Sequence, residues 1–322
     1  MFQNPVINLT GMSGVQYSAI DENSMKNFKI LSWSRANWRS FVLFVSIFVS
    51  VALSTTSLII ALNRSTESHP RISSAQMNLS SFANRSVLFI AAHPDDVVGA
   101  NGGFVASLSE VGANISVLII TNGNAGCNTS LSKAECAAVR RLEEIDCDGV
   151  LGVPSTQIKI LDFDDNHSWD GTYLPRDIVA YIVRSVRDVQ PFAVFTFFPQ
   201  PEWSLDPKRG YDDMGFHPDH QCVGNLVASA IAGFSASDPA IYNNSYGTAF
   251  QPEQLWFWKF SKPPFCFAIS ENLLMVKTAA FLKHRSQYSG NGSTLVQWMR
   301  EFSSLVGVDC GCEWAEGFHR YF

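Results

Sequence analysis

The sequence lacks the charge patterns of a nucleic-acid-binding protein. Its net charge is −6 and its pI is near 5.6, whereas proteins that bind nucleic acid are usually basic. No run of five like charges is present, so a charged interaction tail is not expected. Internal repeats are lacking, which excludes solenoids and propellers, and no Cys-x2-Cys pair has zinc-ribbon spacing. A chain of 322 residues with 46% hydrophobic content can instead bury one large core.

One long segment lacks charge altogether. Residues 41–62 contain no charged side chain and are bracketed by Arg39 and Arg64. At about 1.5 Å per residue, a helix of this length spans roughly the 30 Å hydrocarbon core of a bilayer. A buried helix of a soluble protein is usually apolar on one side only, and a cleaved signal peptide has an apolar stretch of only about 7–15 residues. The segment therefore predicts one transmembrane helix, a signal anchor.

The residues around this segment predict its orientation. Lys26, Lys29, Arg35 and Arg39 precede it and only two basic residues follow closely, so the positive-inside rule places the following domain in the lumen. We therefore expect a single-pass membrane protein of the endoplasmic reticulum or secretory pathway. Eight Asn-X-Ser/Thr sequons follow the segment and predict a glycoprotein. They begin at Asn63, Asn78, Asn84, Asn114, Asn128, Asn166, Asn243 and Asn291.

The cysteines and one sequon carry more specific expectations. All seven cysteines lie beyond the apolar segment, as in an oxidising compartment. Cys127 and Cys136 would close a polar loop if they paired. Because seven is an odd number, at least one cysteine remains a thiol or pairs between chains. Asn114 lies at a strand entry, so we do not expect it to carry a glycan.

The remaining segments divide the chain. Residues 1–40 show no sustained period and predict an N-terminal tail, and residues 63–85 are rich in Ser and Asn and predict a tether. Residues 86–322 predict one domain. The expected strands are 87–92, 115–121, 158–163, 192–198 and 255–260, and the expected helices are 98–112, 133–151, 175–189, 221–232 and 273–288. This alternation predicts an α/β fold with a mostly parallel sheet and helices on both faces. In such folds ligands bind beyond the carboxyl ends of the strands.

Two histidine-containing tetrapeptides lie at such positions. His-Pro-Asp-Asp occupies residues 93–96, directly after a strand, and His-Pro-Asp-His occupies residues 217–220, directly before a helix. Either one alone is also typical of a polar loop whose aspartate caps a helix. Together they offer the imidazole and carboxylate donors that zinc binds, although Fe²⁺ also accepts two histidines and a carboxylate. A site with three protein ligands leaves a position for water, which is typical of catalytic zinc.

These tetrapeptides, together with other short motifs, resemble the PIG-L/LmbE family of zinc-dependent de-N-acetylases. The resemblance extends over residues 87–319 and implies a Rossmann-like fold and hydrolysis of an N-acetylglucosamine-bearing substrate. The further motifs are Gly102-Gly103, Thr121-Asn122-Gly123, Arg140-x-x-Glu143, Leu151-Gly152, Lys277, His284-x-Ser286-Gln287 and Ala315-Glu316-Gly317-Phe318.

The resemblance implies a metal site and a general base. His93, Asp96 and His220 resemble the family's zinc ligands. Asp95 resembles the general base, which deprotonates the attacking water and later protonates the leaving amine. Amide cleavage requires both steps, because water is a weak nucleophile and an amine is a poor leaving group.

The resemblance also implies the residues around the substrate. His217, steered by Asp219, resembles the group that stabilises the oxyanion. Arg140 occupies the position that contacts the substrate's polar head, and Asp170 is expected to assist; for both, a surface ion pair is the alternative. One residue departs from the family pattern, since Val97 stands where the family usually has Glu. That difference keeps open a metal- or sugar-binding pseudoenzyme.

The substrate has two candidate classes at this stage. A membrane anchor suits a lipid-linked substrate such as N-acetylglucosaminyl-phosphatidylinositol in GPI-anchor biosynthesis, because both partners share one surface. That branch of the family works on the cytosolic face, however, whereas the charge bias and sequons predict a lumenal domain. A lumenal or cell-surface deacetylase of another glycan, or of a small N-acetyl-glucosaminide, is the alternative. Asp162, Asp164 and Asp165 are expected to form a solvated strand end rather than a calcium site.

Overall fold

The computed structural model describes residues 74–128, 130–166, 175–200, 217–233, 235–242, 244–288 and 292–322. Within these ranges, no helix is both long enough and apolar enough to cross a membrane. The predicted tail, the predicted span at residues 41–62 and the first part of the predicted tether lie outside them.

Eight strands form a single sheet within the described ranges. Their bounds are β1 (Ala75–Gln76), β2 (Ser86–Ala91), β3 (Asn114–Thr121), β4 (Ile158–Phe163), β5 (Ala193–Phe197), β6 (Gln254–Trp258), β7 (Phe265–Ala268) and β8 (Ala315–Arg320). The strand order is β1-β7-β8-β6-β5-β2-β3-β4. Only β8 runs antiparallel to its neighbours, β6 and β7. The mostly parallel sheet is therefore confirmed.

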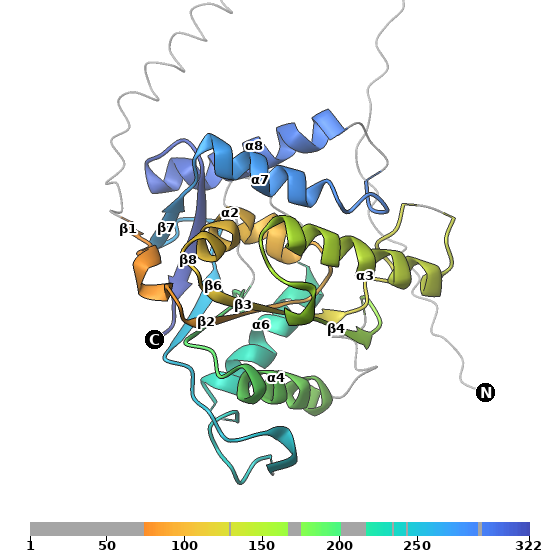
Figure 1. The fold of residues 1–322 in the computed structure, drawn as a ribbon, viewed down its shortest axis with the longest axis vertical. Coiled ribbons are helices and arrows are strands. Elements are labelled where there is room, and N and C mark those ends of the chain that lie inside the picture. The colour runs from red at the N-terminus through yellow and green to blue at the C-terminus, as the bar shows by residue number, and fades with distance from the viewer. Residues whose placement is uncertain are drawn as a thin grey trace, which may run out of the picture. The chain divides into compact units, whose positions relative to one another are not determined.

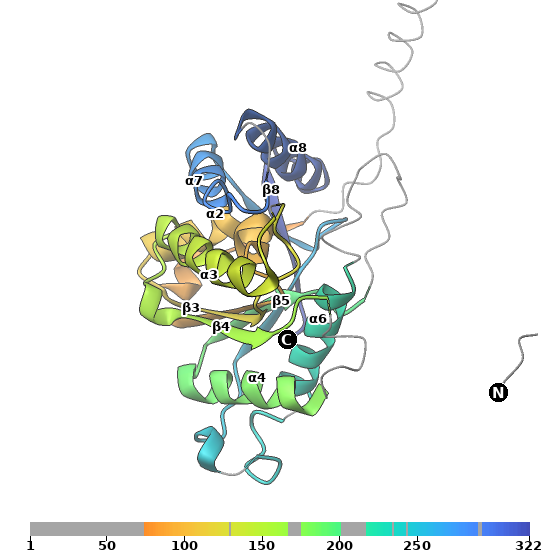
Figure 2. The ribbon, with the colours of Figure 1, turned by 90° about the vertical axis from the view of Figure 1, so that its right-hand side faces the viewer.

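Helices cover both faces of this sheet, as predicted (Figures 1 and 2). One face carries α2, α3, α7 and α8, and the other carries α4 and α6. The bounds are α2 (Asp96–Glu110), α3 (Lys133–Val150), α4 (Pro175–Val189), α6 (Pro218–Ile231), α7 (Glu271–Phe281) and α8 (Gly292–Cys310). Short 3-10 helices span Leu79–Phe82, Ser155–Gln157 and Asn244–Tyr246.

The central strands are apolar because helices bury them on both faces. Every residue of β5 is buried, as are all but the first residues of β2 and β3. Phe89, Phe195 and Trp256 occupy paired positions on β2, β5 and β6. Their rings stack across the sheet, with centroids 5.0 Å and 6.0 Å apart. This aromatic row packs β2, which leads into the first tetrapeptide, against β5 and β6.

The sequence placed some element boundaries wrongly. The domain begins before residue 86, because β1 pairs with β7 and Phe82 is buried; a two-residue strand and a single turn show no readable period. The helix expected over 273–288 ends at Phe281, and the expected helices at 98 and 221 begin earlier, at Asp96 and Pro218. Both tetrapeptides therefore reach into the first turn of a helix.

Two disulfides hold the outer parts of the domain. Cys127 and Cys136, whose pairing the sequence left open, form one of them. A second bond joins Cys266 on β7 to Cys310 at the end of α8. This bond was not expected, because the residues of β7 and α8 gave no pattern that predicted either element from the sequence.

Candidate metal-dependent active site

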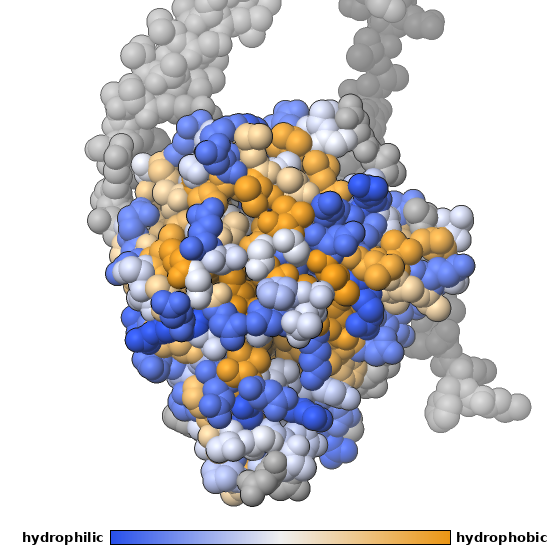
Figure 3. Space-filling model, in the orientation of Figure 1, coloured by the Kyte–Doolittle hydropathy of each residue, from blue (hydrophilic) through white to orange (hydrophobic). Residues whose placement is uncertain are grey.

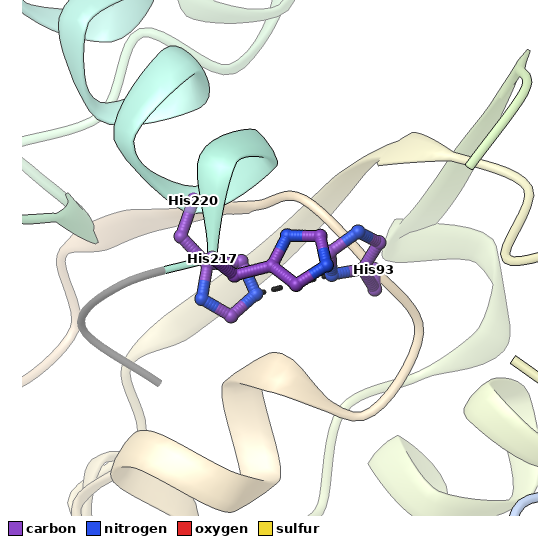
Figure 4. Close-up of side chains that lie close together, drawn as sticks. All are labelled: His93, His217 and His220. Atoms are coloured by element: carbon purple, nitrogen blue, oxygen red, sulfur yellow. Dashed lines mark hydrogen bonds between the residues drawn. The ribbon is translucent and has the colours of Figure 1, made fainter. Parts of the chain in front are cut away.

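The two tetrapeptides meet at one edge of the sheet. His93 follows β2, and His217 and His220 lie at the start of α6, which follows β5 along the chain. Since β2 and β5 are parallel neighbours, their carboxyl ends lie side by side. Figure 4 shows the result: the three imidazoles approach one another from the loop after β2 and from the first turn of α6.

Three candidate ligand atoms converge at this edge. Nδ1 of His93 lies 3.1 Å from Nε2 of His220, which lies 3.1 Å from Oδ1 of Asp96. Nδ1 of His93 is also 3.5 Å from Oδ2 of Asp96. Ligands about 2.0–2.1 Å from a tetrahedral zinc lie about 3.3–3.4 Å from one another. The predicted trio therefore fits a metal ion. His93, His217 and His220 form a second trio, whose candidate ligand atoms lie within 4.8 Å of one another.

The other ring nitrogen of His93 orients this ligand. Nε2 lies 2.9 Å from Oδ1 of Asp165 and 3.0 Å from Oδ2 of Asp219. Burial lowers the pKa of His93, but the surrounding carboxylates, Asp96 foremost, outweigh burial and hold it well above its usual value, so the ring is a cation before a metal binds. A metal would replace the proton on Nδ1, while Nε2–H would still donate to a carboxylate and hold the ring in place. Asp165 is buried, so the expectation of a solvated strand end is wrong for this residue. The chain turns inward after β4, which the residues of that strand do not reveal.

The carboxylate of Asp96 is held by backbone amides. Its Oδ2 accepts hydrogen bonds from the N–H of Ala92 and of His93, at 3.1 Å and 2.6 Å. Burial raises the pKa of Asp96, but the nearby imidazoles of His220 and His93 outweigh burial and hold it well below its usual value. Asp96 is therefore an anion ready to bind a cation. His220 is fixed in turn by stacking on Phe197, with centroids 3.9 Å apart.

Asp95 is held by its backbone in a strained conformation. Its φ is +107°, a region that costs a non-glycine residue about 1–3 kcal/mol and occurs mainly at functional sites. Its N–H donates to Oε2 of Glu144 at 2.9 Å, and its carboxylate accepts a hydrogen bond from the Tyr288 hydroxyl. Neither Glu144 nor Tyr288 was found from the sequence, because each comes from a distant segment.

The pKa of Asp95 suits a general base. Burial raises it to about 6 and Asp96 adds to the rise, while the guanidinium of Arg140, 3.6 Å away, opposes it. A base with a pKa near the working pH accepts a proton readily and can release it again.

Arg140 is not a surface residue. It is buried and donates to the carbonyl of Gly123, to Asp165, to the carbonyl of Pro94 and to Oε1 of Gln287. A surface ion pair is therefore excluded, and Arg140 ties the loop that carries Asp95 to its neighbours. Arg140 also lines the cavity, where a substrate can reach it. Its contact with the polar head of the substrate stays a prediction. Asp170 lies outside the described residues.

His217 caps α6 and faces the metal position. Its Nδ1 accepts a hydrogen bond from the backbone N–H of Asp219 at 3.2 Å, so a neutral ring carries its proton on Nε2. Burial, followed by the charges of His93 and His220, lowers the pKa of His217 to about 4. A neutral imidazole with Nε2–H is a hydrogen-bond donor, as an oxyanion requires. The carboxylate of Asp219 accepts from the N–H of Asn166.

A second buried polar cluster contacts the candidate base through Glu144. Nε2 of His284 lies 3.4 Å from Oε2 of Glu144, beside Cys147 and Asp148. Burial raises the pKa of Asp148 to about 7 and, with the nearby carboxyl of Asp148, holds that of Glu144 well above its usual value. Glu144 therefore accepts the Asp95 N–H without adding a second full negative charge next to the base.

A cavity of about 960 Å³ opens over these residues. The sheet carries two imidazoles and a carboxylate at its carboxyl edge, with a second carboxylate beside them and an open cavity above. These features are those of metal-dependent α/β hydrolases. Residues 88–231 match the profile of the PIG-L family, described as GlcNAc-PI de-N-acetylase.

Known relatives agree with this class. A diacetylchitobiose deacetylase of Thermococcus kodakarensis is 30% identical over 240 residues, which cover 72% of this chain and 82% of the relative. A probable N-acetyl-α-D-glucosaminyl L-malate deacetylase of Bacillus cereus is 26% identical over 158 residues, covering 46% and 61%. The structure of an N,N'-diacetylchitobiose deacetylase from Pyrococcus horikoshii superposes with a TM-score of 0.62 at 27% identity, covering 73% and 83%. The chain belongs to the PIG-L family of de-N-acetylases, which are metal-dependent amide hydrolases.

Proposed function

We propose that the protein hydrolyses the acetamide of an N-acetylglucosamine-containing substrate and uses Zn²⁺ to do so. The observation that carries this proposal is the convergence of His93, Asp96 and His220 within 3.5 Å of one another, directly beside Asp95. Two nitrogens and one oxygen form a donor set that zinc favours, with Fe²⁺ as the alternative ion.

The chain's own residues supply the remaining chemistry. A bound divalent cation polarises a carbonyl oxygen and makes water more acidic. Asp95 takes a proton from the attacking water, and the same carboxyl then delivers it to the nitrogen of the leaving amine. His217 donates its Nε2–H to the developing oxyanion. Arg140 and Tyr288 keep the Asp95 carboxylate in position throughout.

The proposed substrate is a glycan or small glucosaminide in which N-acetylglucosamine is linked to another group. The relatives with the highest identities quoted above act on diacetylchitobiose, which supports a soluble carbohydrate substrate. N-acetylglucosaminyl-phosphatidylinositol is the second candidate, favoured by the description of the family and by the predicted membrane anchor.

The buried position of Val97, away from the cavity, weakens the case for a pseudoenzyme. Its side chain is buried in the first turn of α2 and does not line the cavity. The candidate metal ligands and the base are therefore all present without the carboxylate that the family usually carries there. A replacement beside the ligands can still reduce metal affinity about 10–100-fold.

Acetate release and metal content test the proposed function together. The purified full-length protein, reconstituted with Zn²⁺, should hold about one ion per chain and release acetate from N,N'-diacetylchitobiose. A protein that is fully zinc-loaded but releases no acetate from the disaccharide or from N-acetylglucosaminyl-phosphatidylinositol would contradict the proposal and favour a binding protein.

We also propose that residues 41–62 anchor the protein in the membrane and that its domain is lumenal. Two disulfides and the exposed sequon asparagines Asn78 and Asn84 support an oxidising, glycosylating compartment. Asn114 is engaged by Ser86 and Gln157, in keeping with the expectation that it carries no glycan. Peptide-N-glycosidase should lower the apparent mass of protein made in its native cell type. An unchanged mass would favour a cytosolic domain and the phosphatidylinositol-linked substrate.

A further inference from the structure

Three motifs that lie away from the candidate catalytic residues come together beside the sheet. They are Gly102-Gly103 on α2, Lys277 on α7 and Glu316 on β8, and none of these residues lines the cavity. Nζ of Lys277 lies 2.8 Å from Oε1 of Glu316, and both side chains are buried. Helices α7 and α8 pack around this ion pair, and Figure 3 shows apolar residues gathered over them. Burial of such a pair is costly unless its polar atoms find further partners.

Helix α2 is broken where it meets the ion pair. Asn101 has φ −137° and ψ 23°, which is not a helical conformation, so α2 consists of a first part, residues 96–100, and a second part, residues 102–110. A break leaves backbone carbonyls at the end of the first part and N–H groups at the start of the second without partners in the helix. Because the residues around the break are buried, these groups need partners elsewhere.

The ion pair supplies these partners. Oε1 and Oε2 of Glu316 accept hydrogen bonds from the N–H of Gly103 at 2.9 Å and of Phe104 at 2.7 Å. Nζ of Lys277 donates to the carbonyl of Ala100 at 3.4 Å. The carboxylate thus lies at the N-terminus of the second part and the ammonium at the C-terminus of the first, as the dipole of each part favours. The pair therefore fixes the two parts of α2 relative to each other.

Gly102 and Gly103 allow this close approach because they have no side chain. A Cβ atom at Gly102 would lie 2.8 Å from Cγ of Lys277. One at Gly103 would lie 2.6 Å from Cγ2 of Ile269 and 3.3 Å from Oε1 of Glu316. Carbon atoms in favourable contact are about 3.5–4.0 Å apart. A larger residue at either position would therefore push α2 away from the ion pair.

The first part of α2 carries the candidate base and a candidate metal ligand. Asp95 precedes it and Asp96 is its first residue. Asp96 keeps two hydrogen bonds to backbone amides and lies 3.1 Å from Nε2 of His220. The direction in which a helical side chain points follows from the orientation of its turn. Because the break separates this turn from the rest of α2, its orientation depends on what holds the break.

We propose that Lys277 and Glu316 are positioning residues, which hold the first turn of α2 so that Asp96 meets the metal and Asp95 meets the attacking water. The part of this inference that concerns Asp95 rests on the proposed function, and the part that concerns Asp96 rests on the geometry of the metal ligands. A buried ion pair contributes little net stability compared with uncharged residues of similar volume. The effect of the pair on metal binding and turnover should therefore exceed what lost stability explains.

The test compares zinc affinity and turnover of the full-length protein. The double variant Lys277→Met/Glu316→Gln replaces the pair by uncharged side chains of similar size, so no unpaired charge is left in the core. Partners that orient metal ligands typically change metal affinity about 10–100-fold. The zinc dissociation constant, measured by competition with a fluorescent chelator, should rise at least about tenfold. At saturating zinc, kcat on N,N'-diacetylchitobiose should fall at least about tenfold while KM changes less than about twofold.

Val186→Ala is the matched control for lost stability. Val186 is buried near the end of α4, which covers the other face of the sheet and leads to the start of β5, at the edge away from the site. This variant should unfold at a lower urea concentration and keep the zinc affinity and kcat of the wild type. A double variant that behaves in the same way would give the pair a structural role only and would overturn the proposal.

Gly102→Ala gives a second test in which both charges stay in place. Alanine is a better helix former than glycine, so the helix itself is not weakened. Its methyl group would press on Lys277 and move the ammonium away from the break. The zinc dissociation constant should rise severalfold with little change in the urea unfolding midpoint. Wild-type zinc affinity in Gly102→Ala would overturn the proposal even if the double variant failed to fold.

Hydrogen exchange separates this inference from the proposed function. In the metal-free double variant, backbone amides in residues 92–100 should exchange at least about tenfold faster than in the wild type, whereas those of α4 should not change. Unchanged exchange in residues 92–100 would refute the positioning role. A wild type that releases no acetate would refute the proposed function alone, because zinc affinity and hydrogen exchange still decide the positioning role.

Discussion

Replacement of Asp95 by Asn should change activity and stability in opposite directions. Asn has nearly the same shape and also tolerates the positive φ of this position, so the fold should be kept. It cannot accept a proton from water, and loss of a general base typically costs about 10²–10⁴ in rate. Acetate release should therefore fall by at least about a hundredfold, while zinc content stays near one per chain because Asp95 is not a proposed ligand.

The stability change follows from the pKa of Asp95. A rise from the ordinary value of 3.8 to about 6 corresponds to about 3 kcal/mol, at about 1.4 kcal/mol for each pH unit. The side chain is 17% exposed, so we reduce this to about 2 kcal/mol. Because the folded state holds the proton more tightly, wild-type stability is fully present below about pH 4 and is lost as pH rises to about 6. Asn does not titrate, so the variant should be more stable above pH 6.

Urea unfolding of the metal-free proteins measures this difference. The unfolding free energies of wild type and Asp95→Asn should agree near pH 4 and differ by about 2 kcal/mol at pH 8. Asp162→Asn is the matched control, because Asp162 is exposed at the end of β4; it should change neither activity nor stability. Wild-type turnover in Asp95→Asn would refute the assignment of the base. A stability difference independent of pH would refute the electrostatic reasoning.

Three further predictions concern the same region. His93→Ala and His220→Ala should each strip the metal, measured by elemental analysis after dialysis; full zinc occupancy in the double variant would refute the ligand assignment. His217→Ala should keep the metal but lose about 10²–10³ in kcat, and an unchanged kcat would exclude a role at the oxyanion. Burial raises the pKa of Asp148 to about 7, so wild-type stability falls as pH rises through that value. Asp148→Asn should therefore raise the unfolding free energy by at most about 4 kcal/mol at pH 8 and hardly at all at pH 4. Equal gains at both pH values in urea unfolding would contradict this.

The sequence by itself determined most of the elements and the location of the site. Apolar runs such as residues 115–121 read as buried strands because helices cover both faces of a parallel sheet, and β3 and β4 appear where they were expected. The two tetrapeptides could be placed at one edge because the carboxyl ends of neighbouring parallel strands meet there. The pairing of Cys127 with Cys136 was one possibility that the sequence offered, because it closes a short local loop.

The antiparallel part of the sheet and α8 were decided by tertiary structure. β7 has four residues, and β8 pairs with β6 and β7 only after the chain has passed through α7 and α8. Short strands of this kind carry no period of their own, because their burial depends on which strands lie beside them. The second disulfide could not be inferred from the sequence, because one of its cysteines lies at the end of α8.

The partners of the site residues were also decided by tertiary structure alone. In the sequence, Asp165 is one of several acids at a strand end, yet in the structure it is buried against His93. Glu144 on α3 and Tyr288 in the loop after α7 form hydrogen bonds with Asp95. From the sequence, Arg140 could equally be a surface residue, and only the folded structure shows that it is buried. The physical reason is that an element forms from interactions between neighbours in sequence, whereas the protonation and orientation of a buried polar side chain depend on groups that folding brings from distant segments.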